Sequence, residues 1–293
     1  MPSKSMSMFQ ISSQQAYRQL LNDNVIQLKK LKKVEQSIFK TLTKQDDMYI
    51  DGFSWPVQSN SRFLVDNLYQ HQGQPNLRER LVCQKTQFNN RIRGAIHVFE
   101  QFCRPHKKDA IYLTEQLSTL FKWLIKKYPN TVGSEFVTAS TWRNIIRFKL
   151  KLFPRRLNHQ DLTHLEYANE QFDYALSFDC FEHIPDFKQG LTEILRVLKP
   201  TGKLLFSVPF DVNADETLVR ASINDNNETV FHVEPEYHGN PMSKEGSLSY
   251  YTFGWDLLNT LKSLGFSDAY GLVYWSKKYA YLGGPQLLLC AEK

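Results

Sequence analysis

The chain has 293 residues, 42% of them hydrophobic, which is enough for a folded core in two domains or in one domain with an extension. No apolar run reaches the roughly 18 residues of a membrane helix, and the first residues lack the apolar segment of a secretory signal, so we expect neither a membrane span nor a secreted protein. The net charge of +6 is concentrated in residues 1–108, which hold 17 Lys/Arg against 8 Asp/Glu, but without a nucleic-acid-binding motif this excess indicates a solvated face rather than a nucleic-acid partner.

Residues 1–105 form a first region that we expect to be helical and turn-rich. Apolar residues recur every three or four positions over residues 13–43, which predicts one long amphipathic helix. This helix either packs on the rest of the chain or pairs with a second copy in a homodimer, and the spacing does not separate these arrangements. Residues 49–90 carry Asp-Gly, Trp-Pro and Gln-Pro steps, typical of turns and a small hairpin, and residues 91–103 are again predicted to be helical.

Residues 106–293 form a second region in which strands and helices alternate. The pattern predicts strands near 109–114 and 131–136, a short third strand just before residue 161, and strands near 172–178 and 202–208, with helices near 117–128, 187–198 and 254–264. Such alternation predicts an α/β fold with a parallel sheet that is covered on both faces. The last two strands, near 268–275 and 285–291, have no helix between them, so we expect them to form an antiparallel hairpin.

A sequence motif follows the fourth of these strands. Residues 172–186 read FDYALSFDCFEHIPD, and residues 191–204 read LTEILRVLKPTGKL. Over roughly 30 residues this run resembles the type 11 family of class I S-adenosylmethionine (SAM) dependent methyltransferases. The resemblance implies an enzyme with SAM as its cofactor and with a Rossmann-like sheet, mostly parallel, that ends in an antiparallel hairpin.

The candidate cofactor-binding residues stand at the ends of strands. In open α/β sheets, ligands bind in the crevice at the carboxyl ends of the strands. Glu135 ends the second strand, where an acidic residue hydrogen-bonds ribose hydroxyls in nucleotide-binding units. The resemblance implies that an acidic–apolar pair after the third strand faces the adenine. The full set of candidates is Thr114, Glu115, Gln116, Glu135, Asp161, Leu162, Phe178 and Asp179.

The turn after the first strand departs from the family pattern. Residues 114–118 read TEQLS and contain no glycine, whereas the family has glycines there that let the backbone approach the methionine end of SAM. Either the turn is wider and Glu115 or Gln116 meets the SAM amino group, or the chain is a non-catalytic methyltransferase-like binding protein. We favour the enzyme. The missing G-x-G-x-x-G fingerprint and the terminal hairpin argue against an NAD-dependent oxidoreductase.

Residues 51–57 and 80–91 resemble a zinc-ribbon segment of related methyltransferases. Of the four ligand positions only Cys83 keeps a thiol, because Ser54, Val57 and Thr86 occupy the others. Structural zinc requires four good ligands, so we predict no metal. The four cysteines are far apart and form no CxxC pair, which favours reduced thiols and a cytoplasmic location.

Residues 209–252 form an insertion before the last helix that we expect to cover the pocket. We predict a small-molecule or glycan acceptor that is methylated at oxygen. A nucleic-acid methyltransferase would suit the basic first region, but no tetrapeptide of the amino-methylating type follows the fourth strand. A hydroxyl acceptor benefits from a general base, and histidine suits this role at neutral pH. The catalytic candidates are His183 and His238, and we favour His238 over His232 as the base.

Overall fold

The computed structural model of the chain describes residues 6–70, 73–137, 157–240 and 243–293. The chain forms two compact units: unit 1 comprises Met1–Pro105 and Tyr270–Leu288, and unit 2 comprises His106–Ala269 and Leu289–Lys293. The sequence prediction divided the chain once, after residue 105. In contrast, Tyr270–Leu288, which the sequence assigned to the second region, belongs to unit 1.

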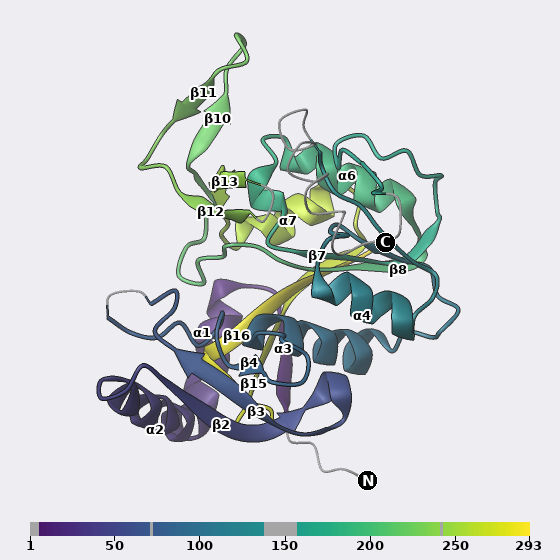
Figure 1. The fold of residues 1–293 in the computed structure, drawn as a ribbon. Helices are drawn as coiled ribbons and strands as arrows, with labels where there is room; N and C mark the ends of the chain where they lie inside the picture. Colours follow the sequence, from purple (N-terminus) through teal and green to yellow (C-terminus); the bar gives the residue numbers. More distant parts are fainter. Residues whose placement is uncertain (1–5, 71–72, 138–156, 241–242) are drawn as a thin grey trace. The chain divides into compact units, whose positions relative to one another are not determined.

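The parallel part of the central sheet lies in unit 2. Its strands follow the order β8-β7-β5-β6 and are parallel, and the end of β16 lies antiparallel on β8, with Cys290 opposite Leu205. Figure 1 shows α4 on one side of β7 and β8 and α6 on the other. The main elements are β5 (Ile111–Leu113), α4 (Thr119–Lys127), β6 (Thr131–Gly133), β7 (Phe172–Phe178), η3 (Phe181–His183), α6 (Phe187–Val197), β8 (Leu198–Ser207), α7 (Asp256–Ser263) and β16 (Tyr281–Glu292). The expected Rossmann-like sheet is therefore confirmed.

Local sequence explains why the helices of unit 2 begin where they do. Asp186 caps α6, since its side chain accepts the N–H of Gln189 at 3.0 Å, and the apolar stripe of the helix then packs into the core. Thr201, near the start of β8, has a φ of 67°. The family pattern has a glycine at that position, so the threonine adopts a conformation that favours glycine.

The insertion, residues 209–252, forms short antiparallel pairs rather than one long loop. β9 (Leu218–Val219) pairs with β14 (Tyr251–Thr252), β10 (Ala221–Ile223) with β11 (Thr229–Phe231), and β12 (Tyr237–Asn240) with β13 (Ser243–Leu248). In Figure 1 the β10–β11 hairpin extends away from the rest of unit 2. The insertion therefore has its own secondary structure, which places individual side chains more firmly than a loop would.

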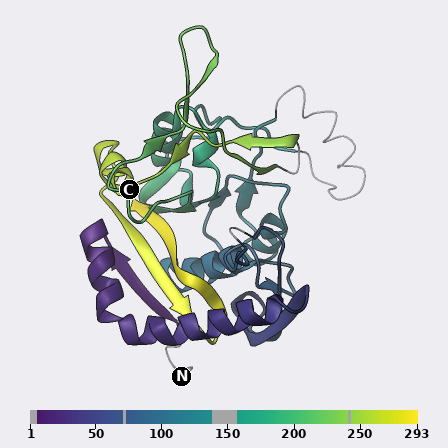
Figure 2. The same cartoon turned by 90° about the vertical axis from the view of Figure 1, so that its left-hand side faces the viewer.

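Unit 1 contains a strand and a helix break that the sequence did not predict. β1 (Ser7–Ile11) lies antiparallel on β15 (Asp268–Ser276), and β15 neighbours β16 in the sheet. The helix predicted over residues 13–43 is two helices, α1 (Gln14–Asp23) and α2 (Val25–Leu42), which Figure 2 shows meeting at an angle. Asn24 causes the break, because its φ of −109° and ψ of 15° are not helical and its side-chain amide donates to Leu20 O at 2.9 Å.

The turn-rich segment of unit 1 forms a three-stranded antiparallel sheet. The elements of this part are β2 (Asp47–Ser54), η1 (Trp55–Val57), β3 (Ser59–Asp66), β4 (Val82–Cys83), α3 (Asn90–Val98) and η2 (Phe99–Cys103). Burial raises the pKa of the Cys83 thiol, but hydrogen bonds with Ser54, Ser61 and Thr86 outweigh it and bring the pKa to about 7. Residues 54 and 86, two of the positions that the resemblance compares with zinc ligands, therefore lie beside Cys83.

Among the described helices, none combines the length and the apolar character that a membrane span requires.

Candidate functional site

The turn after β5 is held by the carboxylate of Glu135, which follows β6. The backbone N–H groups of Gln116 and Leu117 both donate to Glu135 Oε1, each at 2.8 Å. Burial raises the pKa of Glu135, and the two hydrogen bonds oppose this rise. Both bonds end on Oε1, and Oε2 has no hydrogen-bond partner among the described residues. Two predicted parts of the cofactor site are therefore in direct contact, and one carboxylate oxygen can still accept a ligand hydroxyl.

The turn passes so close to β6 that only glycine fits beside it. A Cβ atom added at Gly133 would lie 2.7 Å from the carbonyl oxygen of Glu115 and 2.7 Å from the ring of Phe121. Both distances are far below van der Waals contact. The turn itself contains no glycine, so the missing side chain on the neighbouring strand makes this close approach possible.

The side chain of Gln116 joins the turn to the segment that leads to Asp161. Gln116 is 7% exposed, and its Oε1 accepts the N–H of Asn158 at 2.7 Å. The side-chain amide of Asn158 in turn donates to Gly133 O at 3.0 Å and to the Tyr167 hydroxyl at 2.6 Å. Gln116 therefore has a positioning role whether or not it contacts a cofactor.

The carboxyl end of β7 contains a strained residue at a predicted site position. Asp179 has a φ of 51°, in the left-handed region that aspartate tolerates better than most residues. Its carboxylate accepts the Ser207 hydroxyl at 2.6 Å, and its backbone N–H donates to Ser207 O at 2.9 Å. Phe178 ends β7 opposite Ser207. The Thr114 hydroxyl donates to Ser177 Oγ at 3.0 Å, which joins the ends of β5 and β7.

The thiol of Cys180 lies where the ends of β5, β6 and β7 converge. Burial raises the pKa of Cys180, the carboxylates of Glu182, Glu135 and Glu115 also raise it, and a hydrogen bond with Thr114 lowers it, so that the pKa is about 12. The thiol therefore stays protonated and is not a nucleophile. Its surroundings show that acidic residues from three strand ends share one small region.

Asp161 and Leu162 are not joined to this region by hydrogen bonds among the described residues. Asp161 Oδ1 accepts the N–H of Thr163 at 2.8 Å and its hydroxyl at 2.7 Å, and Leu162 is 9% exposed. The third strand expected before them is a single parallel bridge between Glu135 and His159. A role for this pair beside the adenine stays a prediction.

The two predicted catalytic histidines lie together beside a buried carboxylate. The rings of His183, in η3, and His238, in β12, have centroids 5.0 Å apart and are nearly perpendicular, at 81°. Glu182 Oε1 lies 3.4 Å from His238 Nδ1 and 3.6 Å from His183 Nε2. Glu182 is 0% exposed, and neither carboxylate oxygen has a hydrogen-bond partner. A buried carboxylate in this state is costly unless a positive charge lies beside it.

The other ring nitrogen of each histidine has its own partner. His183 Nδ1 donates to Leu248 O at 2.8 Å, which leaves Nε2 as the nitrogen that faces Glu182. His238 Nε2 lies 3.1 Å from Glu236 Oε1, and Glu236 pairs with Arg220 at 3.1 Å. These contacts fix the orientation of both rings.

Backbone hydrogen bonds fix the insertion to η3. The N–H of Tyr250 donates to Glu182 O at 2.7 Å, and the Tyr251 hydroxyl donates to Pro185 O. His238 is thereby held beside the sheet although it belongs to the insertion. The nearby Glu182 raises the pKa of His238, which burial lowers and Glu236 raises further.

The two carboxylates of this cluster, Glu182 and Glu236, were not predicted from the sequence. Glu182 stands in the recognised motif, but it had no predicted role, and Glu236 was only one of several polar residues in the insertion. The signal was an acidic residue directly before the strand-end histidine and an E-x-H pattern at residues 236–238. His232, the third histidine considered, lies 2.9 Å from Ser222 Oγ and has no contact with the cluster among the described residues.

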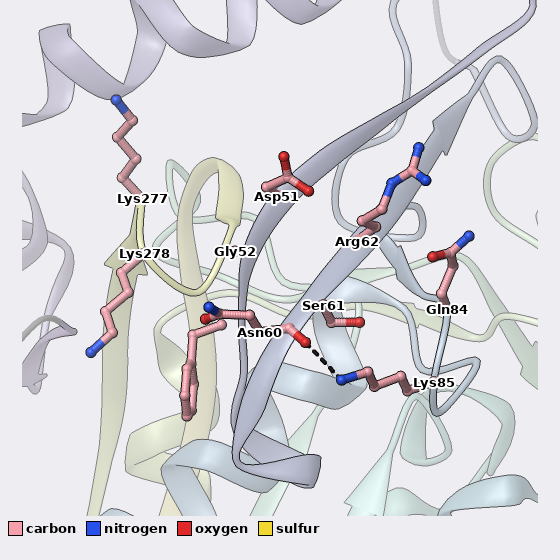
Figure 3. Close-up of a pocket in the computed structure, with 10 residues that line it drawn as sticks. Asp51, Gly52, Asn60, Ser61, Arg62, Gln84, Lys85, Lys277 and Lys278 are labelled. Atoms are coloured by element: carbon pink, nitrogen blue, oxygen red, sulfur yellow. Dashed lines mark hydrogen bonds between the residues drawn. The ribbon is translucent and has the colours of Figure 1, made fainter.

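A separate pocket in unit 1 contains none of the predicted site residues. Its volume is about 1000 Å³, and its charged lining residues are Asp51, Arg62, Lys85, Lys277 and Lys278. Figure 3 shows these side chains and the hydrogen bond from Lys85 Nζ to Asn60 O, which measures 2.8 Å. Four cationic groups against one carboxylate make this pocket electropositive.

Comparison with known proteins identifies a family over part of unit 2. Residues 122–206 match a family model, of type 11, that is described as a methyltransferase domain. The matched segment contains β6, β7, α6 and most of β8, together with Glu135, Asp179 and His183. The resemblance to class I methyltransferases that the motif indicated is therefore confirmed.

Individual relatives are distant. Over 43 residues the chain is 40% identical to phosphoethanolamine N-methyltransferase 2 of Caenorhabditis elegans, a match that covers 15% of this chain and 10% of that protein. The 1,6-didemethyltoxoflavin-N1-methyltransferase of Burkholderia thailandensis, solved with 1,6-didemethyltoxoflavin and S-adenosylhomocysteine, has a TM-score of 0.39 and 16% identity over 69% of this chain and 77% of that chain. A SAM-dependent methyltransferase of Mesorhizobium loti has a TM-score of 0.42 and 13% identity over 68% and 98%. Similarities this low do not identify an acceptor.

Proposed function

We propose that this chain, which carries a methyltransferase domain over residues 122–206, transfers a methyl group from SAM to a small-molecule or glycan acceptor at oxygen. The observation that supports this most is Glu135, which lies at the end of β6 inside the matched segment and contacts the turn after β5. A carboxylate in this place can accept ribose hydroxyls. When bound, SAM supplies a methyl group on a sulfonium, and the methyl–sulfur bond breaks as the acceptor's lone pair forms the new bond.

The residues at the strand ends fit such a cofactor. Glu135 Oε2 is placed to accept a hydroxyl, and Gly133 provides the room that the turn needs. Glu115 adds negative charge near Cys180, which suits a positively charged sulfonium. By position in the family motif, the proposed contacts with the cofactor are Thr114, Glu115, Gln116, Glu135, Asp161, Leu162, Phe178 and Asp179.

His183 and His238 are the proposed catalytic residues. Their imidazole rings are brought together by the insertion and by the segment after β7. A hydroxyl acceptor loses its proton during methyl transfer, so a group that takes up or displaces this proton is needed beside it. In this proposal the acceptor binds beneath the insertion with its nucleophilic atom beside these two rings. The similar proteins include N-methyltransferases, which methylate nitrogen. The choice of oxygen as the methylated atom is therefore a prediction made from the sequence.

One observation favours a second function, that of a non-catalytic binding protein with a methyltransferase fold. The glycine-free turn is already engaged, because Glu135 Oε1 accepts two of its N–H groups and Gln116 Oε1 accepts the N–H of Asn158. If these bonds are permanent, the turn cannot adapt to the methionine end of SAM.

Calorimetric titration with SAM and with S-adenosylhomocysteine distinguishes the two functions. We expect the wild-type chain to bind both, Glu135→Ala to bind at least about 10-fold more weakly, as for the loss of a hydrogen bond to a charged group, and Glu166→Ala to bind as the wild type does. Glu166 is an exposed carboxylate of the same unit and serves as the matched control. A folded wild type that binds neither compound would overturn the enzyme and support the binding protein.

Two further proposals concern the state of the protein. We propose a cytoplasmic protein, from the sequence argument about its cysteines, and a homodimer through α1 and α2. Val25 and Ile26 support the dimer, because they lie at the start of α2 and are 44% and 71% exposed. Light scattering of the wild type and of Ile26→Glu tests it: a dimer that becomes a monomer in the variant is the expected result.

A further inference from the structure

We propose that Glu182, His183 and His238 bind one divalent transition-metal ion of the zinc class. Each side chain offers one ligand atom, and the three atoms lie within 4.8 Å of one another. Two imidazoles and one carboxylate are the ligand set of a common class of catalytic zinc site. This site lies outside the ribbon-like segment on which the expectation of a metal-free protein was based.

The distances between the ligand atoms suit a shared ion better than direct hydrogen bonds. Glu182 Oε1 is 3.4 Å from His238 Nδ1 and 3.6 Å from His183 Nε2. Charge-assisted hydrogen bonds are shorter, at roughly 2.7–2.9 Å. Ligands at the usual bond lengths of about 2.0–2.1 Å around a tetrahedral zinc ion are separated by about 3.3 Å. The two separations from Glu182 are close to this value. The three atoms lie within 4.8 Å of one another, so a movement of the two rings toward each other would bring all three atoms onto one ion.

The second ring nitrogen of each histidine has the partner that metal sites need. A metal-bound histidine almost always donates its other N–H to a carbonyl or a carboxylate, which fixes the ring and the protonation of its nitrogens. His183 Nδ1 donates to Leu248 O at 2.8 Å, and His238 Nε2 lies 3.1 Å from Glu236 Oε1. The nitrogens that remain, His183 Nε2 and His238 Nδ1, are those that face Glu182.

Glu182 provides an independent indication that this arrangement of side chains suits a cation. Its side chain is 0% exposed, and both carboxylate oxygens lack hydrogen-bond partners. Burial of a carboxylate without hydrogen bonds is unfavourable unless positive charge lies beside it, and its neighbours here are two imidazoles at 3.4 and 3.6 Å. A divalent cation between this carboxylate and the two imidazoles would satisfy it with strong bonds.

The role of the ion rests on the proposed function. Three protein ligands leave a fourth position open, as in catalytic rather than structural zinc sites. An acceptor hydroxyl in that position would have its pKa lowered, as zinc does for water, so its proton could pass to solvent before methyl transfer. The site therefore selects acceptors that offer a hydroxyl or an ionised oxygen, and the imidazoles act as ligands rather than as bases.

Metal titration of the full chain, with any histidine tag removed and after treatment with a chelator, tests the site without an activity assay. We expect one Zn²⁺ per chain by calorimetry, and one Co²⁺ whose visible absorption is abolished when Zn²⁺ displaces it. Glu182→Gln and His238→Ala should each weaken binding about 100-fold or more, and Glu236→Gln about 10- to 100-fold. His232→Ala, in the same insertion but outside the cluster, should bind as the wild type does.

Two results would overturn the site: no stoichiometric binding by the folded wild type, or binding that survives both Glu182→Gln and His238→Ala. If the buried Glu182 variant does not fold, the exposed Glu236 variant still provides the test. SAM titration of the metal-free chain separates this proposal from the proposed function. SAM binding without metal binding would overturn the metal site alone, and metal binding without SAM binding would overturn the methyltransferase alone.

Discussion

Gly133 is the residue on which the position of the turn after β5 depends most. In Gly133→Ala the new methyl group would lie 2.7 Å from Glu115 O and from the Phe121 ring, so the turn or the ring must move. We expect the free energy of unfolding to fall by about 1–3 kcal/mol, as in other overpacked sites, and SAM binding to weaken. Urea denaturation measures the first effect and calorimetry the second.

Gly190→Ala is the matched control for this prediction. Gly190 lies in the middle of α6, and an added Cβ would come no closer than 3.6 Å to its neighbours. Alanine is more favourable than glycine inside a helix by about 0.5–1 kcal/mol. The same substitution should therefore destabilise the protein at position 133 and stabilise it at position 190, and equal losses at both positions would contradict the explanation.

The raised pKa of Glu135 should make the free energy of unfolding depend on pH. Burial raises its pKa above the ordinary value of 4.5, so the folded chain holds this proton more tightly than the unfolded chain does. The contribution of Glu135 to stability is therefore greatest below pH 4.5 and decreases as the pH rises toward the folded pKa. Glu135→Gln removes this dependence, so its stability relative to the wild type should increase through that window. A pH-independent difference in urea titrations would contradict the burial of an ionisable group here.

Single residues show clearly what a sequence can and cannot reveal. Glu135 and His183 were predicted because each stands at a fixed offset from a strand or inside a motif. The parts played by Gly133 and Glu182 were not predicted, since they depend on contacts with Glu115 and His238, which are distant in the chain. Asp161 was predicted from the resemblance, yet its carboxylate caps its own turn through Thr163.

At the level of elements, α4 begins directly after the turn, and a side-chain hydrogen bond stabilises its first turn. Ser118 Oγ accepts the N–H of Phe121 at 3.0 Å and so caps the helix. We expect Ser118→Ala to lower the free energy of unfolding by about 1 kcal/mol. Ser263→Ala, at the exposed last turn of α7, should change stability by less than about 0.5 kcal/mol in the same denaturation experiment. Similar losses in both variants would show that the cap is not responsible.

The elements that the sequence predicted well share a strong local pattern. β7, α6 and β8 have continuous apolar runs or a clear helical stripe, and they were placed within a few residues. The break at Asn24 was missed because the apolar spacing of α1 continues into α2, so only the backbone angles reveal it. β1 was missed because its five residues gain their stability from pairing with β15, near the other end of the sequence. The last two strands, β15 and β16, overlap the predicted ranges, and the absence of a helical pattern between them indicated that they are consecutive.

At the level of the whole molecule, we expect the affinity for anions to depend on where the lysines lie more than on the net charge. Lys277 and Lys278 line the electropositive pocket of unit 1, whereas Lys29 and Lys30 lie on α2 outside it. The double variants Lys277→Glu/Lys278→Glu and Lys29→Glu/Lys30→Glu change the net charge equally. We expect the first to elute from a heparin column at distinctly lower salt, because a concave cationic surface concentrates the field. Equal elution of the two variants would show that the pocket has no special affinity for anions.

The position of the glycine on β6 also determines how chains of this kind can be found in genomes. A search that demands glycine between the first strand and its helix rejects this chain, although Gly133 on the neighbouring strand makes room for the turn. A combined pattern, a T-E-Q turn followed by G-S-E at residues 133–135, describes the pair of segments that meet here. Such a two-part fingerprint would separate chains that have moved the clearance to another strand from chains that have lost it altogether.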